Sequence, residues 1–258
     1  MRKLLAIVIL TFKEEMHSKL LFISLFIALV CVGSSKLFTS ITPGAEKAFV
    51  TDISFTLIGW IVSICTIVVV SDIIYKEVTN RTIFILRTNP VNSLQIILGK
   101  YLGLAFSLGL ALLIMELIYL GVFYYYFRTV MNDIGVLFLF TYIKVLIIVS
   151  IGVLGATIFS RITNVLFCVS ILIMGNLTEQ IHQIAERAQS DFSKQIIEWS
   201  MKVIPDFSKY RVLEYVAVEV DYPRNMIVDG VIYGSIYIFI TLFLAVLAYR
   251  LNDRLMEP

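Results

Sequence analysis

Two ionisable residues lie inside long apolar runs of this chain, and they are the first candidates for chemistry. Glu116 lies within the run 97–125, and Lys144 lies within the run 135–159. Charged side chains inside a membrane are costly, and those that occur pair with one another or mark a functional path. Each lies about nine residues from the loop that joins the two runs, which places both about 13 Å below the same surface. We therefore predict that Glu116 and Lys144 pair, either to orient two helices or to line a substrate path.

The sequence contains none of the common motifs of catalytic or cofactor sites. It has no GxxxxGK[ST] phosphate loop for ATP, no HExxH and no GxSxG. The cysteines Cys31, Cys65 and Cys168 stand singly within apolar runs, and His17 and His182 are far apart. Because metal sites and disulfide frameworks need such residues at close spacing, neither is supported. We expect no catalytic residue, no metal and no cofactor bound by this chain.

The composition indicates an integral membrane protein. The 258 residues are 59% hydrophobic and only 16% charged, and the mean hydropathy is +0.90. Soluble domains are about half apolar and a quarter charged. The net charge of +2 is too small to suggest a nucleic-acid partner. We expect an all-α polytopic fold that forms one transmembrane domain over residues 1–258.

Six windows are long and apolar enough to cross the hydrocarbon core, which takes about 20 residues. They lie at 20–38, 53–75, 97–125, 135–159, 163–181 and 228–250. The fifth window ends in polar residues that include Asn176 and Glu179, so we expect this span to be short or broken. Asp72 near the inner end of the second is expected to be solvated at the membrane edge.

An N-terminal helix over 2–15, within the segment 1–19, is predicted to precede the spans. It is expected to be interfacial and to stay in the mature chain, because Lys13, Glu14 and Glu15 stand where a signal peptide would need small residues.

The distribution of basic residues predicts that both termini are cytoplasmic. With that orientation the short outer loops contain only Lys36, Lys47 and Arg128, and most other Lys and Arg residues fall in inner segments. Residues 182–227 then form an extracytoplasmic segment, and residues 251–258 form a cytoplasmic tail. Within 182–227, the pattern from 193 to 204 predicts a helix that Pro205 stops. Such a helix would lie on the outer leaflet, cap the bundle, or act as a lid over an exit path.

The segment EVTNRTIFILRTNPVNSLQIILGKYLG, residues 77–103, is the most patterned polar stretch of the chain. It predicts a short cytoplasmic helix that starts near Glu77 and ends before Pro90, then a new helix capped by Ser93. The apolar residues at 82–86 need a surface to cover them, which suits docking to a cytoplasmic protein. Gly99 and Gly103 form the small-xxx-small pattern of closely packed membrane helices.

This segment resembles the permease subunits of ABC-2 type transporters, in particular the branch associated with maturation of multicopper enzymes and nitrous-oxide reductase. The resemblance rests on Glu77, Arg81-Thr82, Leu86, Pro90-Val91 and Gly99-Lys100-Tyr101-Leu102-Gly103. Weaker likenesses lie at Ile204-Pro205-Asp206-Phe207 and at the basic C-terminal stretch 249–254. The family often has an arginine two residues after Pro-Val, where this chain has Asn92-Ser93-Leu94.

The resemblance implies a permease subunit of an ATP-driven exporter in a bacterial inner membrane. The N-terminal segment would be a connecting helix, and the coupling region 76–96 would be received by a separate ATPase subunit that binds ATP and magnesium. The residues implied in coupling are Glu77, Arg81, Thr82, Ile83, Phe84, Leu86 and Pro90. A second permease copy and a periplasmic or lipoprotein accessory protein are further implied partners.

A different class of function is a non-transporting membrane anchor or assembly scaffold for a periplasmic or lipoprotein partner. The nature of the exported substrate stays open, since a lipid, peptide, glycan or sulfur species would all fit an apolar bundle. The spans have no Met-rich or Cys-His path, so direct transport of copper ions is unsupported.

Overall fold

The computed structural model is an all-helical bundle. It describes residues 2–34, 46–79, 92–129, 133–187, 203–217 and 223–255, and no strand occurs in these ranges. The helices are α1 (Arg2–Met16), α2 (Lys19–Ser34), α3 (Glu46–Thr79), α5 (Ser93–Phe127), α6 (Ile134–Ile158), α7 (Arg161–Asn176), α8 (Thr178–Arg187), the 3-10 turn η2 (Ser208–Tyr210), α10 (Leu213–Ala217) and α11 (Arg224–Leu255). The fold class predicted from the sequence is therefore confirmed at the level of an all-helical membrane-type protein.

Four helices in the described ranges are long and apolar enough to cross a membrane, rather than the six predicted. They are Glu46–Asp72 of α3, Ser93–Phe127 (α5), Ile134–Ile158 (α6) and Asn225–Leu251 of α11. The predicted first and fifth spans correspond to α2 and α7, which have 16 residues each. A 16-residue helix is about 24 Å long, less than the roughly 30 Å of the hydrocarbon core. The fifth span is broken, as predicted, because the chain turns at Leu177 before α8 begins.

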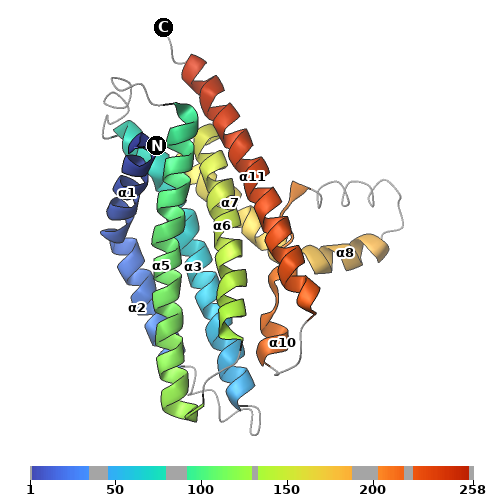
Figure 1. The fold of residues 1–258 in the computed structure, drawn as a ribbon. Coiled ribbons are helices and arrows are strands. Elements are labelled where there is room, and N and C mark those ends of the chain that lie inside the picture. The colour runs from blue at the N-terminus through green and yellow to red at the C-terminus, as the bar shows by residue number, and fades with distance from the viewer. Residues whose placement is uncertain are drawn as a thin grey trace.

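The long helices lie side by side, and α8 projects away from them (Figure 1). The first residues of α1 and the last of α11 lie at the same end of the bundle, which we call the inner end (Figure 1). From the outer end, α3, α6 and α11 run inward, and α5 runs in the opposite direction (Figure 1). Which side of a membrane the inner end faces stays a prediction.

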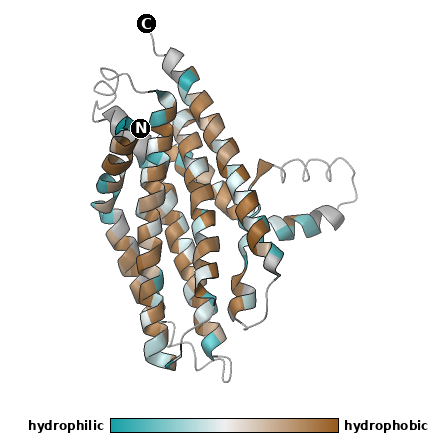
Figure 2. Ribbon diagram, in the orientation of Figure 1, coloured by the Kyte–Doolittle hydropathy of each residue, from teal (hydrophilic) through white to brown (hydrophobic). Residues whose placement is uncertain are grey.

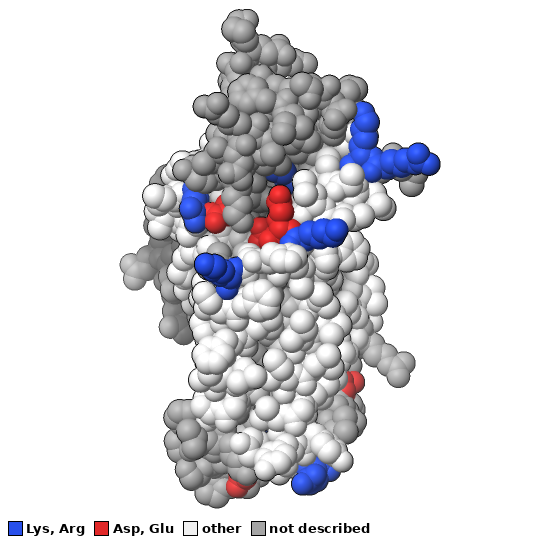
Figure 3. Space-filling model, turned by 90° about the vertical axis from the view of Figure 1, so that its left-hand side faces the viewer, with Lys and Arg blue, Asp and Glu red and all other residues white. Residues whose placement is uncertain are grey.

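The central helix of the bundle is α6, which packs against α3, α5, α7 and α11. Its sequence is apolar on all sides, as expected of a helix that is surrounded by others. Brown, hydrophobic residues cover most of the long helices in Figure 2, and hydrophilic residues gather on α8 and at the helix ends. Figure 3 shows one face of the molecule with a broad middle zone free of Lys, Arg, Asp and Glu, and with charged residues above and below it. This zone is the surface that a bilayer would cover.

The N-terminal helix is present, but it runs along α5 rather than across the end of the bundle. Ile7 faces Gly99, and Thr11 faces Gly103 four residues further along both helices. This constant offset means that α1 and the start of α5 point in the same direction. Two glycines of α5 therefore let the two helices pack along their length, and the place of α1 relative to a membrane interface stays a prediction.

Candidate functional site

A cavity of about 380 Å³ lies among α3, α6, the junction of α7 with α8, and the segment 210–213. Its apolar wall contains Phe55, Trp60, Phe140 and Tyr210, and its polar lining includes Asp52, Thr141, Lys144, Asn176, Gln180 and Arg211. Along α3 the lining runs from Asp52 inward to Trp60, and along α6 it runs from Leu137 inward to Lys144. The cavity therefore extends over about two helical turns, or roughly 10–12 Å, within the outer part of the bundle.

Lys144 is a lining residue of this cavity, and its partners are neutral groups. Its Nζ donates a hydrogen bond of 2.8 Å to Oδ1 of Asn176, and it lies 5.2 Å from the centre of the Phe207 ring. Asn176 is fixed in turn, because its Nδ2 donates to the carbonyl of Leu172 at 2.7 Å. The amide of Asn176 thus points its oxygen at Lys144, at the place where α7 ends.

The predicted pairing of Glu116 with Lys144 is wrong. Glu116 is buried on α5, and its Oε1 has no hydrogen-bond partner among the described residues, whereas Lys144 bonds Asn176. The physical reason is the rotation of α6. Tyr142 faces α5, since its hydroxyl donates to the carbonyl of Ala105 at 3.1 Å. Lys144 follows two residues later, about 200° around the helix, and so points away from α5 toward α7.

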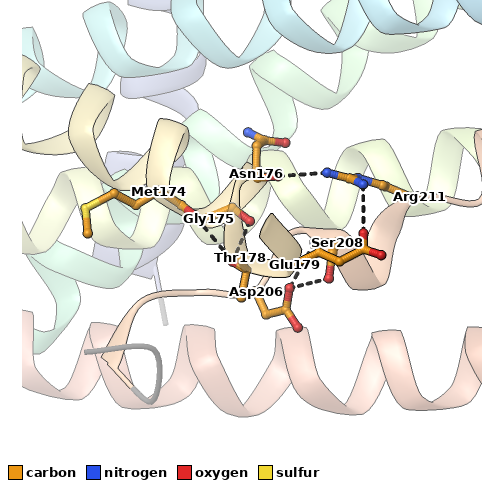
Figure 4. A network of polar contacts seen from close by, with 8 residues as sticks. All are labelled: Met174, Gly175, Asn176, Thr178, Glu179, Asp206, Ser208 and Arg211. Atoms are coloured by element: carbon orange, nitrogen blue, oxygen red, sulfur yellow. Dashed lines mark hydrogen bonds and ion pairs between the residues drawn. The ribbon is translucent and has the colours of Figure 1, made fainter. Parts of the chain in front are cut away.

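A second positive charge, Arg211, reaches the same region from the outer segment. Its guanidinium donates to the carbonyl of Asn176 at 2.8 Å and to Oε2 of Glu179 at 3.0 Å, as Figure 4 shows. Glu179 lies in the first turn of α8, where the helix dipole favours an acid. Arg211 therefore ties the broken junction of α7 and α8 to the segment that precedes α10.

The segment 205–211 is docked firmly on the end of α7. The backbone N–H of Phe207 donates to the carbonyl of Gly175 at 3.0 Å. A Cβ at Gly175 would lie 2.6 Å from both the carbonyl oxygen of Pro205 and the Phe207 ring, so only glycine permits this approach. Thr178 closes the turn by donating to the same Gly175 carbonyl at 2.9 Å (Figure 4). The close fit makes this segment one wall of the cavity.

The same segment also contacts α11. The hydroxyl of Tyr210 donates to the carbonyl of Gly230 at 3.0 Å, and the backbone N–H of Asp206 donates to the hydroxyl of Tyr233 at 2.9 Å. Oδ1 of Asp206 accepts hydrogen bonds from the backbone N–H and the hydroxyl of Ser208 (Figure 4). Burial raises the pKa of the Tyr210 hydroxyl above its ordinary value. The predicted helix over 193–204 lies almost wholly outside the described residues.

At the inner end, Asp72 is not solvated as the sequence suggested, because Arg161 neutralises it. Nη2 of Arg161 donates to Oδ2 of Asp72 at 3.0 Å, and its Nε forms an ion pair with Oδ1. Asp72 is buried near the end of α3, and Arg161 is the first residue of α7. Next to this pair, Asn164 donates to the hydroxyl of Ser71 at 3.2 Å and to the carbonyl of Gly152 at 3.0 Å. These bonds fix the inner end of α7 to α3 and α6.

The two glycines predicted to mark close packing lie at the contact of α5 with α1. A Cβ at Gly99 would be 2.8 Å from Cγ2 of Ile7, and one at Gly103 would be 2.6 Å from Cβ of Thr11. Cβ atoms do not approach so closely, so both positions need glycine for α1 to stay in place. Lys100 lies between them and is buried.

Most of the predicted coupling region falls outside the described residues. Glu77 lies in the last turns of α3, but the structure describes its backbone only. The other predicted coupling residues, Arg81, Thr82, Ile83, Phe84, Leu86 and Pro90, lie outside the described ranges. At the far side of this region, α5 begins at Ser93, with Asn92 rather than Ser93 as its N-cap residue and with no side-chain cap.

The sequence reasoning missed the groups that hold α7 and the cavity, namely Asn164, Asn176, Phe207 and Arg211. Two of them carried a signal. Asn164 is an amide inside an apolar run, where polar side chains bond between helices. Asn176 is a polar residue at the end of an apolar run, and on its own it predicts only a weakened span. The partners of Phe207 and Arg211 depend on how the outer segment folds back, and no local pattern gives that.

Comparison with known proteins adds no relative from which a function is transferred. No protein-family model matches the sequence, and no curated protein matches it.

Proposed function

We propose that this chain is the permease subunit of an ATP-driven exporter of the ABC-2 type. In this proposal it forms the translocation path, pairs with a second permease copy, and couples to a separate ATPase subunit that binds ATP and magnesium. It would lie in a bacterial cytoplasmic membrane with both termini in the cytoplasm.

The observation that carries the proposal is the polar cavity in the outer part of an apolar bundle. Lys144 lines a hollow of about 380 Å³ together with Asn176 and Arg211. A charged side chain inside a bundle is expensive, and such residues face a cavity or path that uses them. A protein that serves only as a membrane anchor needs neither the hollow nor the half-buried ammonium group of Lys144.

The arrangement at the inner end supports coupling to an ATPase. Residues 80–92 connect the inner end of α3 to the start of α5, and α1 packs beside that start at Gly99 and Gly103. A force applied to this connection would act first on α3 and α5. The Asp72–Arg161 pair then links the inner end of α3 to α7, whose other end holds Asn176 in the cavity lining.

The decisive experiment co-expresses the chain with candidate phosphate-loop ATPases from the same genome, beginning with any that a neighbouring gene encodes. The purified complex is reconstituted in liposomes, and ATP hydrolysis is compared with that of the ATPase alone. We expect Glu77→Ala, and separately deletion of 82–86, to remove the effect of the permease on hydrolysis. Glu46→Ala is the matched control, because Glu46 is an exposed acid in the first turn of the same helix at the outer end.

Two results would contradict the proposal in different ways. If both coupling variants bind the ATPase and alter hydrolysis as the unmodified chain does, the docking role of 77–86 is wrong. If the unmodified chain forms no complex with the ATPase, the anchor or scaffold function is favoured instead.

A further inference from the structure

The cavity contains a cation that the described residues do not neutralise at close range, and this observation points to its ligand. We propose that the cavity binds the anionic headgroup of an amphiphile, a carboxylate or phosphate attached to an apolar chain, with Lys144 as the principal contact. The binding site stands on the geometry below. Its role as a substrate site rests on the proposed export function.

The first step of the argument is the state of Lys144. Its two close partners, the Asn176 amide oxygen and the Phe207 ring, are both neutral, and the described residues place no carboxylate within 4.0 Å of it. An ammonium group has three donors, of which Asn176 uses one. Lys144 is half-buried, and even partial removal of an ammonium from water is unfavourable unless an opposite charge and further hydrogen bonds compensate it. A bound anion would supply both.

The second step is the distribution of charge along the cavity. Lys144 is the innermost lining residue of α6, and the guanidinium group of Arg211, whose charge Glu179 offsets, contacts the carbonyl of Asn176 beside it. Asp52 is the outermost lining residue of α3 and is exposed, and Glu179, which pairs with Arg211, is also exposed. The acidic groups thus lie toward water, where screening weakens them, and the cationic group lies inside.

The third step is the apolar wall, which favours an amphiphile over a small free anion. Phe55, Phe140 and Trp60 line the cavity, and a volume of about 380 Å³ accommodates a headgroup with a short length of chain. Trp60 is also 41% exposed on the surface of the bundle, and Ile64, one turn further inward on α3, is 50% exposed. The apolar wall therefore continues onto the surface that faces lipid, where the rest of an acyl chain would lie.

Binding to the purified full-length chain in a non-ionic detergent tests the proposal. A Trp199→Phe background leaves Trp60 as the only tryptophan, so its fluorescence reports occupation of the cavity. The probes are lysophosphatidylglycerol and oleate as anionic amphiphiles, lysophosphatidylcholine as a zwitterionic one, and inorganic phosphate as a free anion. We expect both anionic amphiphiles to bind at least tenfold more tightly than lysophosphatidylcholine, and phosphate to bind far more weakly than either.

Variants then assign the contact. Lys144→Met should weaken binding of the anionic amphiphiles about 30-fold, which corresponds to about 2 kcal/mol, and Lys144→Arg should restore most of it. Thr141→Val is the matched control, because Thr141 lines the same cavity one turn outward on α6 and carries no charge. Asp52→Asn should leave binding of an anionic amphiphile unchanged or tighter, whereas a ligand held by an amine would bind more weakly.

Three outcomes would overturn the proposal. Equal affinity for the anionic and zwitterionic lysolipids would show that charge does not select the ligand, and this comparison needs no variant. Unchanged affinity in a folded Lys144→Met protein would remove Lys144 from the site. Equally tight binding of inorganic phosphate would make the ligand a free anion. None of these measurements uses the ATPase. A negative binding result would therefore contradict the ligand proposal without bearing on the coupling experiment.

Discussion

Arg161, the first residue of α7, forms a two-point contact with Asp72, near the inner end of α3. Nη2 donates to one carboxylate oxygen at 3.0 Å while Nε pairs with the other. Parallel contacts of this kind fix the guanidinium plane relative to the carboxylate, so they set orientation as well as distance. The side chain of Asp72 is 11% exposed and that of Arg161 is 46% exposed. The pair is therefore a partly solvated ion pair that joins α3 and α7, two helices that are far apart in the sequence.

Removing the charge of Asp72 should loosen this junction. We expect Asp72→Asn to lower the free energy of unfolding in detergent micelles by about 1 kcal/mol, a small value because half of Arg161 is solvated. The exposed Asp229 of α11 is the control, and Asp229→Asn should change stability by less than about 0.5 kcal/mol. The exchanged pair Asp72→Arg with Arg161→Asp should recover part of the loss. No recovery in the exchanged protein, with both single variants impaired, would mean that the contact is not the cause.

Through this junction, α7 connects the inner end of α3 to the cavity in the outer part of the bundle. At its inner end are Arg161 and Asn164, and at its outer end is Asn176, which bonds Lys144 and Arg211. The 16 residues between these ends span about 24 Å as one rigid helix. A displacement of the inner end of α3 would reach the cavity through this helix, provided that both ends hold.

The packing of α1 on α5 gives a second prediction. The same glycine-to-alanine change should destabilise the protein at one position of α5 and not at another. Gly103→Ala places a methyl group only 2.6 Å from Cβ of Thr11, which requires α1 to move away. We expect a loss of about 1–3 kcal/mol in stability, as for other overpacked sites. Gly121→Ala on the same helix has no atom within 4 Å of the new Cβ and should be neutral or slightly stabilising, because alanine favours helix.

Thermal unfolding of the two alanine variants in the same detergent measures this difference directly. If Gly103→Ala and Gly121→Ala unfold at the same temperature, the contact of α1 with α5 does not contribute to stability.

The long helices could be predicted from the sequence, whereas the cavity could not. Apolar runs of membrane length appear as α3, α5, α6 and α11 because hydropathy and length are local properties. The break after Asn176 also had a local signal in its polar residues. The place of Lys144 along α6 follows from its position in the run, but its partner depends on the rotation of α6, which brings Tyr142 to face α5. Rotation comes from packing between helices, and a single helix that is apolar all round gives no sign of it.

Asn164 supplies a third prediction, for a polar side chain buried between three helices. Its Nδ2 donates hydrogen bonds to the hydroxyl of Ser71 in α3 and to the carbonyl of Gly152 in α6, and the residue is fully buried. Asn164→Leu removes both bonds and forces a bulkier branch against Gly155, where the present Oδ1 already lies very close. We expect a loss of about 1–3 kcal/mol, since each interhelical bond in a membrane contributes about 0.6–1.7 kcal/mol and a steric term adds to it.

The matched control for this site is Ser170→Ala in the same helix. Ser170 is exposed, and among the described residues its hydroxyl bonds only the carbonyl of Leu166 in its own α7, so its removal should change the unfolding temperature little. If Asn164→Leu is as stable as Ser170→Ala, the bonds from Asn164 do not hold α7 in place.

Tyr210 provides the last prediction, because it joins the outer segment to α11 through one hydroxyl. That hydroxyl donates to the carbonyl of Gly230 at 3.0 Å, and Tyr210→Phe removes the bond while keeping the ring that packs on Phe140. We expect a loss of about 1 kcal/mol and faster hydrogen exchange confined to residues 205–213. Tyr215→Phe, at an exposed position of α10, should leave exchange of these residues unchanged.

The stabilising effect of the Tyr210 hydroxyl should also depend on pH. Burial raises the pKa of Tyr210 in the folded protein, so the contribution of this hydroxyl to stability is complete below the ordinary tyrosine pKa of about 10 and is lost as pH rises beyond it. The stability difference between the unmodified protein and Tyr210→Phe should therefore shrink above about pH 10, and a difference that grows with pH would contradict the assignment of the hydroxyl as a buried donor.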